Sequence, residues 1–209
     1  MNDPLIDRLN TALRAPLPGH DVFMRMSGYK RPNMEEVLQR RPPPRQSAVL
    51  ILLYPHRTEL HTVLMLRPEY EGVHSGQVAF PGGRREDVDP DLQATALREF
   101  AEETGARVDA RIMGSLSPIF IPPSHSLVTP FVAHAPQLGP TDPDPREVAA
   151  LIRTPLSELL RDDILKRREM HVQVLGGRAE VPYYDIQGHV VWGATAMMVA
   201  ELRALLGKG

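Results

Sequence analysis

The chain has 209 residues, of which 24 are Lys or Arg and 26 are Asp or Glu, so its formal net charge at pH 7 is −2. This balance argues against a nucleic-acid binder, which normally carries a strong basic excess. The absence of cysteine excludes disulfides, zinc–thiolate sites, iron–sulfur clusters and a cysteine nucleophile. No apolar run approaches the roughly 18 residues of a membrane span, and the N-terminus has no signal-peptide core. We therefore expect a cytoplasmic protein without a membrane or nucleic-acid partner.

Residues 1–44 are expected to form an N-terminal arm, followed by a single main domain at residues 45–209. Apolar residues at helical spacing predict a helix at 5–13, and a further helical turn is expected at 32–38 with Asn33 as its cap. The arm is expected to pack either on its own domain or on a partner subunit, and the second alternative implies a homodimer.

The main domain is expected to begin with two strands joined as a hairpin. Residues 48–54 form a continuous apolar run that is typical of a strand buried on both faces, and residues 62–66 form the second strand. Further strands are expected at 77–80, 111–116, 119–121 and 127–134, a short helix at 154–160, and a last hairpin from 172–174 and 181–185.

Two longer helices are expected at 91–104 and 194–206. The first has strong boundary signals, because Asp89 is expected to cap it, Pro90 suits its first position, and Gly105 ends it.

Three glutamates gather on one side of the first of these helices. At about 100° per residue, Glu99, Glu102 and Glu103 lie opposite the apolar residues. Like charges at this spacing destabilise a helix by a few tenths of a kcal/mol, whereas a divalent cation such as Mg²⁺ needs such a cluster of oxygen ligands. Arg98 lies four residues before Glu102 and can hold that carboxylate. A glutamate-rich face is also typical of an ordinary solvated helix.

The segment before the helix favours the metal interpretation. Pro81, Gly82 and Gly83 indicate a tight backbone with positive φ at one glycine. A turn that exposes backbone N–H groups beside a carboxylate–metal cluster suits a diphosphate, because the metal neutralises phosphate oxygens and activates water.

Gly83, followed after a spacer by residues 98–106 (Arg-Glu-Phe-Ala-Glu-Glu-Thr-Gly-Ala), resembles the Nudix box. That motif is a glycine and a spacer before Arg-Glu-apolar-x-Glu-Glu-x-Gly-apolar. The common box has a glutamate eight residues before the arginine, where this chain has Pro90, and Asp89 is the candidate replacement. The spacer is also one residue longer than usual.

Residues 72–83 (Gly-Val-His-Ser-Gly-Gln-Val-Ala-Phe-Pro-Gly-Gly) are similar to the signature upstream of the box in coenzyme A diphosphatases, and residues 190–196 are similar to the ending of that subfamily. The signature commonly has an arginine at the place of Gly72. Because an arginine is the natural partner of a phosphate, its absence predicts discrimination against dephospho-coenzyme A of less than about tenfold, or roughly 1.4 kcal/mol.

The resemblance implies the Nudix fold, an α/β (α+β) architecture in which a mixed sheet lies between helices. It implies hydrolysis of the diphosphate linkage of a nucleoside diphosphate derivative with Mg²⁺ or Mn²⁺. Coenzyme A, giving 3′,5′-ADP and 4′-phosphopantetheine, is the first candidate. The alternatives are ADP-ribose or a dinucleotide, a nucleoside triphosphate, and a non-catalytic Nudix-fold binding module. The clustered glutamates argue against the last of these.

The resemblance also assigns roles to residues. Glu99 and Glu103 would be the main metal ligands, and Glu102 a third ligand or the base that helps deprotonate the attacking water. Arg98 would orient Glu102. Gly82 and Gly83 would shape the phosphate loop. His74 is expected either to contact a substrate phosphate or to make a structural hydrogen bond within its loop.

Four other features have ordinary explanations. Ser124 and His125 indicate no nucleophilic catalysis without a positioned acid, and their loop is expected to line the substrate cleft. The basic run 166–168 is expected to be a solvated helix end. Trp192 is expected in the core, and Arg67 in a surface salt bridge, with contact to a phosphate as its alternative role.

Overall fold

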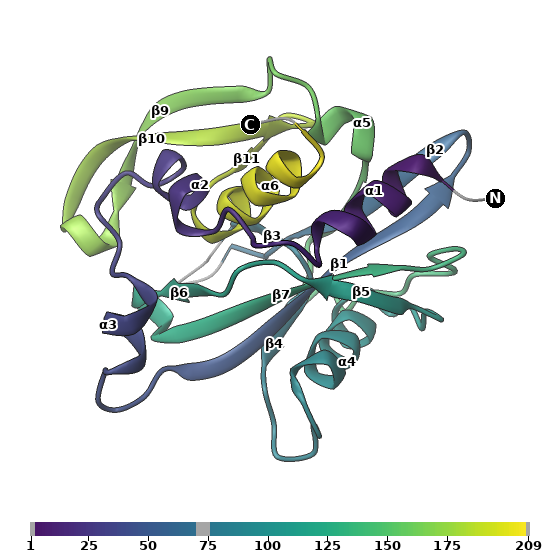
Figure 1. The fold of residues 1–209 in the computed structure, drawn as a ribbon, viewed down its shortest axis with the longest axis horizontal. Coiled ribbons are helices and arrows are strands. Elements are labelled where there is room, and N and C mark those ends of the chain that lie inside the picture. The colour runs from purple at the N-terminus through teal and green to yellow at the C-terminus, as the bar shows by residue number, and fades with distance from the viewer. Residues whose placement is uncertain (1–2, 70–75, 208–209) are drawn as a thin grey trace.

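The structure is a computed structural model that describes residues 3–69 and 76–207. A mixed sheet lies at its centre, with α4 on one face and α1, α2 and α6 on the other (Figure 1). The helices are α1 (Pro4–Ala12), α2 (His20–Arg25), α3 (Met34–Leu38), α4 (Leu92–Thr104), α5 (Leu156–Leu159) and α6 (Gly193–Leu205). This layered arrangement confirms the expected α+β architecture.

The central sheet has strand order β3-β2-β1-β7-β5, with β4 also paired to β1, β6 to β7 and β8 to β2. Only the β1–β7 pairing is parallel among the described pairs, so the sheet is mixed. Its strands are β1 (Arg45–His56), β2 (Glu59–Leu66), β3 (Val78–Ala79), β4 (Gly82–Arg84), β5 (Arg111–Ser115), β6 (Ile119–Ile121), β7 (Ser126–His134) and β8 (Ala150–Pro155). A smaller antiparallel sheet contains β9 (Leu165–Val172), β10 (Gly177–Ile186) and β11 (His189–Val191).

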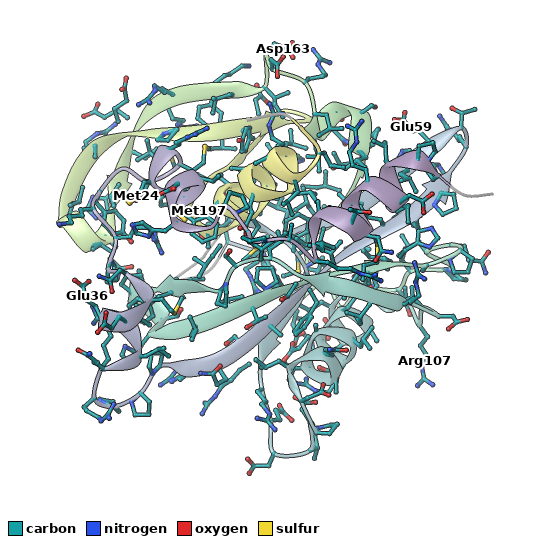
Figure 2. All side chains as sticks on the ribbon, in the orientation of Figure 1. Met24, Glu36, Glu59, Arg107, Asp163 and Met197 are labelled. Carbon is teal, nitrogen blue, oxygen red and sulfur yellow. The ribbon has the colours of Figure 1, made fainter. Side chains whose placement is uncertain are left out.

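Strand β1 separates two apolar cores because its side chains alternate between the two faces of the sheet. Ile51 and Leu53 pack into the core beneath α6, whereas Leu50 and Leu52 pack against α4. Figure 2 shows Met197 of α6 in the interior, where it is 1% exposed. The expected two-sided burial of this strand is confirmed.

The N-terminal arm packs on its own domain, which is the first of the two alternatives. Leu9 of α1 is fully buried, and α2 packs against α6. The backbone N–H of Gly19 donates to the buried carboxylate of Glu201 at 2.8 Å, and Ser117 donates to the same carboxylate.

Nowhere in the described part of the chain does a helix combine the length and apolar character of a membrane span.

Three sequence predictions need correction. Helix α2 was not expected, because its six residues follow a proline-rich segment. Residues 150–155 form a strand, and the helix that follows is shorter than the expected 154–160. The basic run 166–168 lies in the exposed strand β9 instead of ending a helix. There Lys166 and Arg167 pair with acidic side chains of β10, which accounts for charge on a strand.

Candidate active site

Helix α4 begins one residue later than predicted, and its cap is Asp91 instead of Asp89. The Asp91 carboxylate accepts the backbone N–H of Ala94 at 2.8 Å. Gly105 ends the helix in the left-handed conformation with φ of 70°, as predicted. Because Asp91 caps the helix, Asp89 is available for another contact.

Asp89 is buried and forms a bidentate ion pair with Arg98. The Nε and Nη2 groups of Arg98 donate to the two Asp89 oxygens, each at 2.9 Å. Asp89 also accepts the Thr95 hydroxyl at 3.0 Å and the backbone N–H of Glu86 at 2.9 Å. The Arg98 guanidinium holds the pKa of Asp89 well below its usual range, and these hydrogen bonds reinforce the shift.

The remaining side of Arg98 contacts two of the three glutamates. Its Nη1 donates to Glu102 at 2.8 Å and to Glu99 at 3.1 Å. The predicted contact between Arg98 and Glu102 is therefore present, with Glu99 as an additional partner. The Glu102 side chain is 55% exposed, so its carboxylate faces solvent.

Glu103 is buried, although the helical periodicity placed it on the solvent face. Its two oxygens accept the backbone N–H of Gly82 at 2.7 Å and the Arg67 guanidinium at 3.3 Å. Strand β4 covers this side of α4, which the periodicity of the helix alone does not reveal. Burial raises the pKa of Glu103 to about 7, although Arg67 and the Gly82 N–H act in the opposite direction. Burial likewise raises the pKa of Glu99.

The two glycines belong to a strand instead of the predicted exposed turn, and close approach explains both of them. A Cβ on Gly82 would lie 2.3 Å from the carbonyl oxygen of Ala48 in β1. A Cβ on Gly83 would lie 2.5 Å from the Glu99 carboxylate. Positive φ occurs at Gly82, at 157°, but its N–H binds Glu103 and is not offered to a ligand.

The donor chemistry at this site fits a hard divalent cation. Glu99 and Glu103 are one helical turn apart, and the charge of Glu99 helps to raise the pKa of Glu103, so a cation between them would relieve the repulsion. Mg²⁺ is commonly held by one or two carboxylates together with water and substrate phosphates. Among residues 3–69 and 76–207, no three acidic or histidine side chains are gathered as a complete metal-binding group. Glu102 is turned toward Arg98 instead.

A cavity of about 550 Å³ opens beside the glutamates and is lined by Gly82, Gly83 and Trp192. Four arginines also line it, and within the described residues no aspartate or glutamate does. The arginines are Arg31, Arg45, Arg67 and Arg84. Such a lining attracts a ligand with several negative charges.

The other residues that the sequence pointed to have different positions in the structure. Trp192 lines the cavity, so its expected place in the core is wrong. Ser124 also lines the cavity, as expected for its loop. The Arg67 salt bridge is present, but its partner Glu103 is buried. His74 and Gly72 lie outside the described residues.

Sequence reasoning missed Arg31 and Arg45 as cavity residues. Both come from segments that precede or open the domain, and neither is part of a recognisable motif. The position of Arg31 depends on where the arm passes β6, and that of Arg45 on which end of β1 borders the cavity, so no local pattern could have identified them.

Comparison with known proteins gives the family. The NUDIX domain family matches residues 44–173. A Cronobacter sakazakii protein named uncharacterized Nudix hydrolase NudL is 36% identical over 165 residues, covering 78% of this chain and 84% of that protein. The NudL protein of Photorhabdus laumondii is 36% identical over 130 residues, covering 62% of this chain and 68% of that protein. A solved Nudix hydrolase from M. smegmatis, RenU, aligns with a TM-score of 0.49 at 17% identity, covering 78% of this chain and 86% of that one.

The acidic helix beside the mixed sheet and the arginine-lined cavity together form a site whose charges suit a divalent cation and a phosphorylated small molecule. The chain belongs to the Nudix family of diphosphate-cleaving hydrolases.

Replacing Asp89 tests whether it positions Arg98. Asp89→Asn keeps an acceptor for the Glu86 N–H but removes the charge that binds the guanidinium. We expect a lower melting temperature at pH 7 and a loss of activity of about tenfold to a hundredfold, as is typical when a supporting residue is changed. The pKa of Asp89 is lower in the folded protein than the value of 3.8 in the unfolded chain, so the ionised carboxylate stabilises the fold above pH 3.8. This stabilisation is lost as the pH falls below 3.8 and the carboxylate is protonated.

The matched control is Asp91→Asn on the same turn, because asparagine caps a helix as well as aspartate does. Thermal unfolding of the variants from pH 8 to pH 3 provides the measurement. The deficit of Asp89→Asn should be constant above about pH 5 and should shrink below about pH 4. An Asp89→Asn protein with the stability and rate of Asp91→Asn would show that the ion pair has no positioning role.

Proposed function

We propose that this protein hydrolyses the diphosphate linkage of coenzyme A and its thioesters in the presence of Mg²⁺ or Mn²⁺. The observation that carries the proposal is the arrangement of opposite charges around one cavity. Arginines line the cavity, and Glu99 and Glu103 contact the strand that forms its wall. A polyanion and its divalent cation would both find partners there.

In the proposed site, Glu99 and Glu103 hold the cation, which when bound neutralises phosphate oxygens and activates a water molecule. Glu102 is exposed and faces solvent, so it is the candidate to take a proton from that water or to complete the metal site. Arg98 holds Glu102 and is itself fixed by Asp89. Arg98 is therefore a positioning residue in this proposal, and it does not contact the substrate.

Arg67 has the position expected of a residue that contacts the diphosphate. It lines the cavity and donates to Glu103 at 3.3 Å, so one guanidinium lies next to both the proposed metal ligand and the space for the substrate. A guanidinium can form parallel hydrogen bonds to phosphate oxygens while keeping its carboxylate partner. Developing negative charge on the reacting phosphate would be stabilised from this side.

The choice of coenzyme A is supported by the similarity of residues 72–83 and 190–196 to coenzyme A diphosphatases. The alternative substrates are ADP-ribose and dinucleotides, which share the diphosphate but lack the pantetheine arm. Apolar side chains such as Val78, Val128 and Met198 line part of the cavity and favour a ligand with an uncharged arm.

A substrate panel tests the proposal. Purified protein is incubated with Mg²⁺ and equal concentrations of coenzyme A, acetyl-coenzyme A, ADP-ribose, NADH and a nucleoside triphosphate, and the products are separated by chromatography. We expect the highest kcat/KM for coenzyme A or its thioester, with 3′,5′-ADP as one product. Exclusive cleavage of ADP-ribose would contradict the substrate assignment but not diphosphate hydrolysis. Absence of turnover on the whole panel would contradict the proposed activity.

A further inference from the structure

Arg31 differs from the other three arginines of the cavity. Arg45 and Arg84 are exposed, where water screens their charge, and Arg67 is paired with Glu103. Arg31 is partly buried, and no carboxylate of the described residues forms an ion pair with it. A cation withdrawn from water without an anionic partner is costly, and a bound anion would offset this cost.

Neutral groups hold the Arg31 guanidinium in place. Its Nη1 donates to the hydroxyl of Tyr29 at 3.0 Å, its Nη2 donates to the carbonyl oxygen of Phe120, and its Cζ lies 5.3 Å from the centre of the Tyr29 ring. These contacts fix the side chain without neutralising it. They use two of the five N–H groups of an arginine, which leaves the others for oxygens of a bound anion.

Different elements of the fold hold Arg31 and Arg67 at the cavity. Arg67 is joined to α4 through Glu103, whereas Arg31 is joined to β6 through Phe120. The arm reaches this wall because α3 packs beside β6, where Val37, Phe120 and Leu127 form a small apolar cluster (Figure 1). A ligand that fills the cavity can therefore contact Arg67 with its diphosphate and Arg31 with another part.

We propose that Arg31 forms a second anion-binding site, which takes a phosphomonoester that the substrate carries apart from its diphosphate. This inference rests on the proposed function, since it assumes a nucleotide diphosphate substrate in the cavity. A guanidinium binds such a group through charge-assisted, bidentate hydrogen bonds. Burial lowers the pKa of Arg31, in agreement with a cation that has no anionic partner in the protein.

The proposal changes the substrate selectivity expected from the sequence. Gly72 in place of an arginine predicted discrimination against dephospho-coenzyme A of less than about tenfold. With Arg31 in the cavity, we expect the protein to prefer the ligand with the additional phosphate by about tenfold or more. The N-terminal arm would then supply the cation that the signature lacks.

Equilibrium binding tests the site without turnover. The single tryptophan of the chain, Trp192, lines the same cavity, so its fluorescence reports ligand binding. The full chain is titrated with 3′,5′-ADP and with 5′-AMP, which differ by one phosphate, in the presence of EDTA. We expect Arg31→Gln to weaken 3′,5′-ADP binding about tenfold or more and to change 5′-AMP binding less than about twofold.

Two further variants keep the test decisive. Arg40→Gln removes the same charge from an exposed arginine near the same wall, since the Cζ of Arg40 lies 4.8 Å from the centre of the Phe120 ring. Arg40 does not line the cavity, so the affinities for 3′,5′-ADP and for 5′-AMP should both be unchanged. Arg31→Lys keeps the cation and should restore part of the preference for 3′,5′-ADP. Equal weakening of both ligands by Arg31→Gln and Arg31→Lys, or no weakening by either, would overturn the proposal.

Free phosphate is the other source of the same anion, and a third titration separates the two. We expect inorganic phosphate to bind far more weakly than 3′,5′-ADP. Tighter binding of inorganic phosphate, lost in Arg31→Gln, would assign the residue to a free anion and overturn its role in substrate selection. Failure of the proposed function would appear separately, as absent turnover on the Mg²⁺ panel.

Discussion

Excess EDTA is expected to abolish turnover of every diphosphate substrate, and added Mg²⁺ or Mn²⁺ is expected to restore it. The reason lies in the charges of the site. Glu99 and Glu103 are partly or fully buried on one side of α4, and burial raises the pKa of both carboxyl groups. A bound divalent cation would make two such carboxylates compatible with an anionic substrate. The measurement is product formation before and after metal replacement.

Circular dichroism of the same samples controls for unfolding. The fold should survive chelation, because the apolar cores on the two faces of the sheet do not include the glutamates proposed to bind the metal. Full activity in excess chelator would rule out the proposed use of Glu99 and Glu103. Loss of activity that Mg²⁺ and Mn²⁺ fail to restore, with intact secondary structure, would contradict the choice of metals.

Features that depend on neighbouring residues in the sequence were predicted well. The periodicity of residues 91–104 predicts helix α4 almost to its ends, and the four-residue spacing predicts the contact between Arg98 and Glu102. The apolar run in β1 likewise predicts a strand buried on both faces. In each case the determinant is the local geometry of a helix or a strand, which the sequence carries directly.

Features that depend on tertiary packing were not predicted. Glu103 is buried because β4 lies against α4, and Gly82 of β4, 21 residues earlier in the chain, donates its backbone N–H to the carboxylate. Asp89 was interpreted as a cap because its position suits one, but the next aspartate takes that role. Arg31 enters the cavity only because the arm passes β6. Contacts between residues distant in sequence decide the cases of Glu103 and Arg31, whereas the choice between the two aspartates is decided within the first turn of the helix.

Glu103→Gln is expected to reduce kcat at least about a hundredfold while the protein keeps its fold. The amide keeps the shape of the side chain and an acceptor for the Gly82 N–H, but it removes the charge that the cation requires. Its effect on stability should depend on pH. Between pH 4.5 and about 7, the unfolded protein loses the Glu103 proton whereas the folded protein retains it. The unfolded state then binds fewer protons, so wild-type stability decreases as pH rises through this range.

Glutamine has no proton to lose, so the melting temperature of Glu103→Gln relative to wild type should rise between pH 4.5 and about 7 and then remain level. Thermal unfolding at pH 4.5, 6, 7 and 8 measures this difference, and a steady-state assay measures the rate. Glu102→Gln is the matched control on the adjacent position, where the side chain is 55% exposed. It should also reduce the rate about a hundredfold, as a lost ligand or base. If both variants turn over every substrate at near wild-type rates, the acidic side of α4 is an ordinary solvated surface and the metal site lies elsewhere.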